Sequence, residues 1–165
     1  MLFLGCNGGT SKTEFILADD KGGILSHRIY PAFRYGGVGD DTFRRSMHDA
    51  LHEVLNEAGV KPGEVSFSVF GLAAYGEAEG MEKAVQVALG EIFLQEHTAI
   101  VNDAVISGSG SLPGSPEMTE SAKPEYPPLV RALAIAAGKY LPADFLQSML
   151  SKIHRTLNQS MSINF

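Results

Sequence analysis

The sequence predicts an α/β domain in which helices cover a mixed β-sheet. Three short apolar segments separated by tight turns open the chain and predict an antiparallel meander. Two later strand patterns each follow a helical pattern, so they must return to the sheet through crossovers and pair in parallel. We therefore expect a mixed five-stranded sheet with flanking helices, in the order β-β-β-α-β-α-β.

The meander is expected from strands at residues 2–6, 13–19 and 24–30. Each is a short run rich in apolar and β-branched or aromatic side chains. The turn at residues 7–12 contains Asn-Gly-Gly, and the turn at residues 19–23 contains Asp-Asp-Lys-Gly-Gly. Both compositions favour tight reversals of the chain, which supports antiparallel pairing.

Helical periodicity begins after the meander. Asp40 or Asp41 can cap the start of a helix over residues 40–58, and Gly59 can end it. A strand at residues 65–71, a helix at 78–89 and a strand at 98–102 follow, and helical patterns return at residues 127–137 and 142–157. The apolar positions that define the first helix are Phe43, Met47, Ala50, Leu51, Val54 and Leu55.

Composition bounds the class of protein. The chain has 165 residues, 44% of them hydrophobic, which suits one domain with a proper core. A net charge of −6 argues against a nucleic-acid partner. The single cysteine, Cys6, suits a reducing cytoplasm, and no apolar run reaches the length of a membrane span. We expect a cytoplasmic protein with no membrane and no nucleic-acid partner.

The turn between the first two strands is suited to binding phosphate. Adjacent glycines let consecutive N–H groups converge on an anion, while hydroxyl groups add donors and a lysine adds charge. The alternative is a glycine-rich hairpin turn with no ligand, because Asn-Gly is itself a strong turn signal. The candidate phosphate-binding residues are Gly8, Gly9, Thr10, Ser11, Lys12 and Thr13.

This turn resembles the first phosphate motif of the actin-like and hexokinase-like superfamily, in particular N-acetylglucosamine kinases and BadF-type ATPases. Val69–Gly76 and Val101–Ala104 resemble two later segments of the same family, in the same order. The resemblance implies a ribonuclease-H-like, actin-like ATPase domain that binds ATP and Mg²⁺. Asn7 stands where the family has the aspartate that holds magnesium, and an amide supplies no charge to a hard cation.

By the same resemblance, Asp103 matches the general base that accepts the proton of the sugar hydroxyl. Asn102 would orient the substrate or the end of the strand. Gly71, Tyr75 and Gly76 would contact the sugar through backbone and ring stacking. Each has a structural alternative: Asp103 could cap the element that follows it, and the glycines could serve only a tight strand-to-helix connection.

Four parts of the chain are expected. Residues 1–106 resemble the N-terminal lobe of a kinase, and residues 107–125 have the composition of a flexible linker. Residues 126–157 resemble the C-terminal helices of the family, which pack back on the first lobe. Residues 158–165 are expected to form a frayed tail. No segment resembles the family's second, adenosine-binding lobe.

The leading hypothesis is the substrate-side lobe of an ATP-dependent N-acetylglucosamine-type sugar kinase, inactive alone because the nucleotide lobe is missing. The alternative is a non-catalytic domain, dissected, truncated or designed, with a structural role. An activator with an iron–sulfur cluster is excluded by the single cysteine. A homodimer is expected, since a lobe without its partner exposes apolar surface. His48 and His52 share a helix face but lack a glutamate-bearing metal motif, so the sequence favours surface roles.

Overall fold

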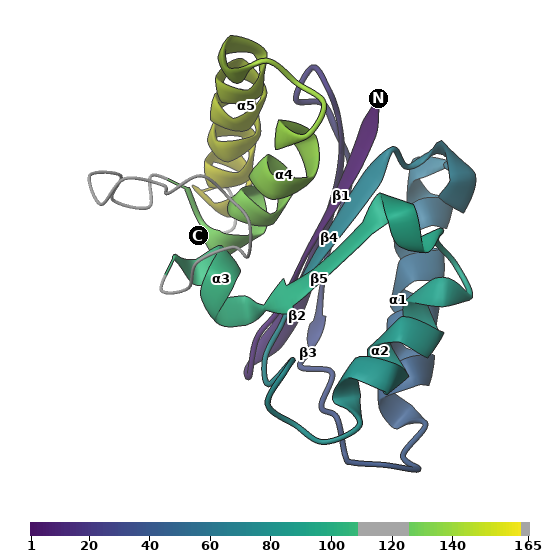
Figure 1. Cartoon of the computed structure of the whole chain (residues 1–165). Coiled ribbons are helices and arrows are strands. Elements are labelled where there is room, and N and C mark those ends of the chain that lie inside the picture. Colours follow the sequence, from purple (N-terminus) through teal and green to yellow (C-terminus); the bar gives the residue numbers. More distant parts are fainter. Residues whose placement is uncertain (109–125, 163–165) are drawn as a thin grey trace.

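The computed structural model describes residues 1–108 and 126–162. Its centre is a five-stranded sheet in the order β3-β2-β1-β4-β5 (Figure 1). The first three strands form the expected antiparallel meander, and β4 and β5 extend the sheet in parallel with β1. The strands are β1 (Leu2–Gly8), β2 (Lys12–Asp19), β3 (Ile24–Pro31), β4 (Phe67–Leu72) and β5 (Thr98–Asn102).

Helices cover both faces of the sheet (Figure 1). Alternation along β1 divides the core, because Leu4 and Cys6 face α1 and α2 whereas Phe3 faces α3, α4 and α5. The described residues therefore form a three-layer α/β structure, as the sequence predicts. The helices are α1 (Thr42–Ala58), α2 (Met81–Gly90), α3 (Asp103–Ser107), α4 (Pro128–Gly138) and α5 (Ala143–Ser162).

Helix α4 lies directly on the central strand β1. A Cβ atom added to Gly5 would lie 3.1 Å from the backbone nitrogen of Leu133 and 3.2 Å from the carbonyl oxygen of Leu129. A side chain at this position would therefore push α4 away from the sheet by a few tenths of an ångström, and glycine avoids this. The buried face of α4 consists of Leu129, Val130, Ala132, Leu133, Ala136 and Ala137.

The ends of several elements differ from the expectations. Strand β1 continues two residues further, to Gly8, because it pairs with both β2 and β4 up to that residue. A short helix, α3, begins at Asp103, which the sequence pattern did not indicate. The prediction of a frayed tail from residue 158 is wrong for its first residues, since α5 continues to Ser162. Most of the linker expected at residues 107–125 lies outside the described residues.

Candidate functional site

The candidate site lies at the carboxyl end of the parallel strands. Gly8 of β1 is in register with Leu72 of β4, and Leu72 is in register with Asn102 of β5. The three strands therefore end level with one another, and the segments that follow them meet at this end of the sheet. Open α/β sheets place their ligand sites at such strand ends. The glycine-rich turn follows β1 and Asp103 follows β5, and these two strands lie on either side of β4.

The glycine-rich turn is closed by a backbone hydrogen bond from the Gly9 N–H to the Lys12 carbonyl, at 3.0 Å. Thr10 and Ser11 are exposed at its tip, where their hydroxyl groups are open to a ligand. Thr13 differs from them, because it is buried and its Oγ1 accepts the N–H of Phe33 at 3.2 Å. Thr13 therefore anchors the segment after β3 to the sheet.

Lys12 is held in an ion pair by its own strand. Its Nζ lies 3.0 Å from Oε1 of Glu14, two residues further on the same face of β2. The same Oε1 is 4.0 Å from Nε2 of His27 on β3. Burial lowers the pKa of His27, and the neighbouring Glu14 carboxylate opposes that shift. Sequence analysis missed Glu14 and His27, although the spacing of Lys12 and Glu14 on a strand places them on one face.

Asn102 holds the loop after β4 in place. Its side-chain amide donates to the Tyr75 carbonyl at 3.0 Å and to Oε1 of Glu77 at 3.1 Å. Its Oδ1 accepts the N–H of Ala104 at 3.0 Å, which caps α3. Asn102, rather than Asp103, is thus the capping residue. These contacts give Asn102 a structural role at the end of β5.

The loop from residue 73 to residue 80 borders the glycine-rich turn, since the Ala73 N–H donates to the Gly8 carbonyl at 2.7 Å. Ala74 and Gly76 have φ values of 64° and 83°, in the left-handed region. Tyr75 is half-buried and packs against the core on the α1 and α2 side. Burial and then the charge of Glu82 raise the pKa of its hydroxyl.

Gly71 is fixed by packing. It lies in β4 on the face that α3 covers, and a Cβ atom there would overlap Cδ1 of Ile106. This packing contact is sufficient to explain why position 71 is a glycine, and contact with a sugar is not needed to explain it. Ile106, which the sequence analysis did not single out, is fully buried in the core of that face.

Asp103 is the first residue of α3 and is half-buried. Among residues 1–108 and 126–162, no hydrogen-bond or ion-pair partner of its carboxylate is found. Its carboxylate is therefore available to a ligand at the end of the sheet. A general base needs a carboxylate that is free to reach the proton of its substrate.

The residues at the expected magnesium position do not suit the ion. Asn7 is in register with Glu14 on one side and Gly71 on the other, and the carboxylate of Glu14 already pairs with Lys12. Within the described residues, no three His, Cys, Asp or Glu side chains gather in an arrangement that could hold a metal. Mg²⁺ favours carboxylate ligands, and an amide beside an occupied glutamate does not supply them.

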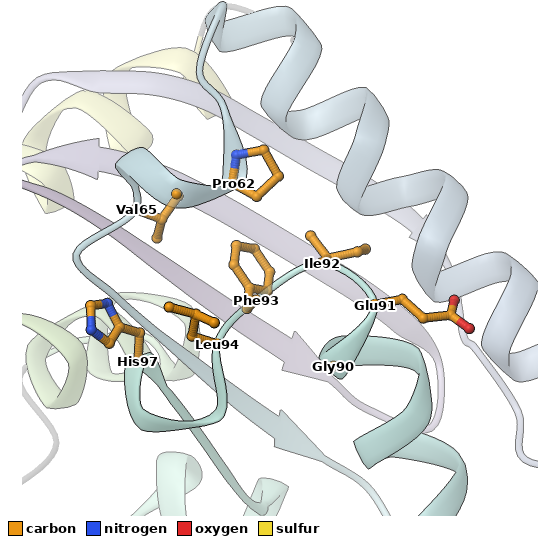
Figure 2. Close-up of a pocket in the computed structure, with 9 residues that line it drawn as sticks. Pro62, Val65, Gly90, Glu91, Ile92, Phe93, Leu94 and His97 are labelled. Carbon is orange, nitrogen blue, oxygen red and sulfur yellow. The ribbon is translucent and has the colours of Figure 1, made fainter.

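A hollow lies at the end of the strands opposite to the candidate site (Figure 2). It has a volume of about 310 Å³ and lies beside the short turns that precede β4 and β5. Val65, Ile92, Phe93 and Leu94 give it a largely apolar lining, and His97 stands at one side. None of the residues predicted to bind phosphate or sugar contributes to this hollow.

Two further properties bear on the class of protein. No helix in the described parts of the chain is both long and apolar enough to cross a membrane. Cys6 is fully buried in β1, and burial raises the pKa of its thiol. It therefore behaves as a core residue.

The chain is similar to part of several solved structures. The ROK hexokinase of Thermus thermophilus has a similar structure, with a TM-score of 0.48 and 20% identity over 65% of this chain and 35% of that chain. Component A of (R)-2-hydroxyglutaryl-CoA dehydratase from Acidaminococcus fermentans has a TM-score of 0.38 and 19% identity over 64% of this chain and 32% of that chain. The chain thus spans about a third of the length of each. The comparison with curated proteins found no match.

The comparison with family models found one that matches more than half of the chain. It covers residues 4–111, and so includes the glycine-rich turn, the loop after β4 and Asp103. This chain belongs to the BadF/BadG/BcrA/BcrD ATPase family.

Proposed function

We propose that this chain carries the substrate-side half of an ATP-dependent phosphotransferase site of the sugar-kinase type, with an N-acetylglucosamine-like sugar as acceptor. The observation that carries the proposal is the register of Gly8, Leu72 and Asn102, which brings the glycine-rich turn and Asp103 to one end of the sheet. Phosphoryl transfer depends mainly on positioning and charge neutralisation, so such a convergence is what the reaction needs.

Each part has a proposed role. The backbone N–H groups after Gly8, with the hydroxyl groups of Thr10 and Ser11, would bind the nucleotide's phosphate oxygens. Lys12 would add charge once it leaves Glu14. Asp103 would accept the proton of the attacking sugar hydroxyl, and the loop of Tyr75 and Gly76 would contact the sugar.

The chain alone is proposed to be inactive. The matched part of this chain covers only 35% and 32% of the two similar structures, and the proposal assigns the other side of the nucleotide to a second lobe. Asn7 also leaves the magnesium position without a charge. ATP is therefore proposed as a weakly held ligand here, and no step through Mg²⁺ is assigned.

A second candidate is a single-lobe domain with a structural role. It is favoured by Gly71, Asn102 and Thr13, whose contacts in the structure are all explained by packing or by internal hydrogen bonds. Under this proposal the family's site is retained as a scaffold and binds no phosphate.

A titration separates the two candidates. ATP, ADP or inorganic phosphate is added to isotope-labelled protein, and the amide signals of Gly9, Thr10 and Ser11 are followed by NMR. The kinase-type proposal expects saturable shifts at these amides that weaken in Lys12→Ala and persist in Lys83→Ala, an exposed control on α2. No shift at millimolar ligand would favour the structural role.

A further inference from the structure

Two histidines on α1 point their ring nitrogens at each other. His48 and His52 are one helical turn apart, and their Nε2 atoms are 3.2 Å apart. The ring centroids lie 4.3 Å apart, with 60° between the ring planes. His52 is exposed and His48 is half-buried, beside the buried face of the helix that contains Met47 and Leu51. This pair is not part of the site at the ends of the strands.

The spacing matches that of two ligands on one metal ion. Zinc–nitrogen bonds to histidine are about 2.0–2.1 Å long, so two nitrogens 3.2 Å apart subtend about 100° at a shared ion. That angle is close to tetrahedral. Without a metal, one imidazole of the pair must donate its proton to the other, which fixes the tautomers but leaves the same geometry.

A carboxylate lies near the second ring nitrogen of His48. Oδ1 of Asp49 lies 3.8 Å from Nδ1 of His48, on the side of the ring away from His52. In metal sites, a carboxylate often occupies this place and contacts the ring nitrogen that does not bind the metal. Of the two arginines on the preceding turn, Arg44 is paired with Asp41 and Glu91, which reduces its repulsion of a cation.

We propose that His48 and His52 form a bidentate surface site for a divalent transition-metal ion such as Zn²⁺. Imidazole nitrogens suit ions of this class and do not suit Mg²⁺, which takes oxygen ligands. Water molecules occupy the remaining coordination positions. The site is independent of the proposed phosphotransferase function, because α1 lies on the other face of the sheet from Asn7 and Glu14.

Calorimetric titration with ZnCl₂ in a non-chelating buffer tests the site. We expect one saturable equivalent, weakened about tenfold or more in His48→Asn and in His52→Asn, since even outer-shell partners of a metal contribute about 10–100-fold. His154→Asn is the matched control, because His154 faces Asn158 at the same helical spacing, with Nε2 3.1 Å from Nδ2, and offers one imidazole. The control variant should bind zinc as the wild type does.

A second measurement does not depend on calorimetry. Zinc should raise the melting temperature of the wild type and of His154→Asn but not that of the double variant His48→Asn/His52→Asn. The rise should shrink at acidic pH, because a protonated imidazole cannot ligate a metal. Unchanged zinc affinity in both single variants, or no saturable binding by the wild type, would overturn the proposal.

Discussion

Oε1 of Glu14 lies 3.0 Å from Nζ of Lys12 and also faces Nε2 of His27, at 4.0 Å. The cation of the glycine-rich turn is therefore neutralised by its own strand in the absence of a ligand. An anion at the turn must compete with Glu14 for Lys12. The side chain of Glu14 is only 13% exposed, so solvent screens this pair less than it screens a pair on the open surface.

Replacing Glu14 by glutamine should strengthen anion binding at the turn. The change removes a negative charge and frees Lys12, whose side chain is 53% exposed. Ion pairs on the surface contribute about 0.2–1 kcal/mol, and a pair with one largely buried partner lies at the upper end of that range, which predicts about a fivefold gain in affinity. NMR titration with inorganic phosphate measures it. Glu96→Gln, at the opposite end of the sheet, is the control and should leave the affinity unchanged. Equal or weaker binding by Glu14→Gln would show that Lys12 does not serve the anion.

His27 should make the stability of the protein depend on pH. Its pKa in the folded protein is lowered from 6.5, chiefly by burial, so the unfolded chain binds the proton more tightly. The stabilising contribution is fully present above pH 6.5 and is lost as the pH falls through the lowered pKa. Lys12 lowers this pKa, whereas Glu14 and Glu57 oppose the shift.

Urea unfolding of the wild type and of His27→Gln between about pH 8 and about pH 5 checks this. The wild type should lose more stability than His27→Gln over that interval. The control His97→Gln should keep the wild-type slope. Parallel curves for wild type and His27→Gln would contradict the assignment.

Gly71→Ala should destabilise the domain. The new methyl group would overlap Ile106, and overpacking of a core costs about 1–3 kcal/mol. Gly90→Ala is a control, since a Cβ atom there meets nothing within 4 Å. In the double variant Gly71→Ala/Ile106→Ala the space is restored, so the two effects should not add. If the changes in the free energy of unfolding of the two single variants simply add in the double variant, the clash is relieved by other residues.

The isolated chain should show no kinase turnover. Asn7 lacks the charge that holds magnesium, and the contacts on the far side of the nucleotide are not supplied. A coupled assay with ATP, Mg²⁺ and a panel of hexoses and N-acetylhexosamines should give background rates. Turnover that Asp103→Asn abolishes would contradict this prediction.

The chain should form a homodimer at micromolar concentration through exposed apolar side chains. Phe145, at the start of α5, is 67% exposed, and Tyr140 nearby is 41% exposed. Phe145→Ser should therefore shift sedimentation toward monomer. Met149 is unsuitable as a probe because it is buried, so a polar residue there would unfold the core instead. A wild type that stays monomeric at high concentration would refute the prediction.

Most of the fold follows from local patterns. Alternation and turn residues predict the meander, and the spacing of Phe43, Met47 and Leu51 predicts α1. Helical crossovers then require parallel pairing of β4 and β5, which the structure confirms. These features are determined by short stretches of sequence, so they can be read without knowledge of the tertiary structure.

Features that depend on distant contacts could not be predicted. The close fit of Gly71 against Ile106 joins β4 to α3, and the shared contacts of Glu14 join β2 to β3. Residues 103–107 are too few for a helical periodicity, and only the Asn102 cap identifies the start of α3. The continuation of α5 to Ser162 was missed because the polar residues after Leu157 look like a tail.

The packing of α4 against Gly5 has a consequence for the folding of the chain during its synthesis. Gly5 is synthesised well before residues 128–138, which form the helix that covers it. Until α4 emerges, the face of the sheet that carries Phe3 and Val69 has no cover. A nascent chain therefore exposes this apolar face between the synthesis of β1 and that of α4, and that is the interval in which chaperones would bind it.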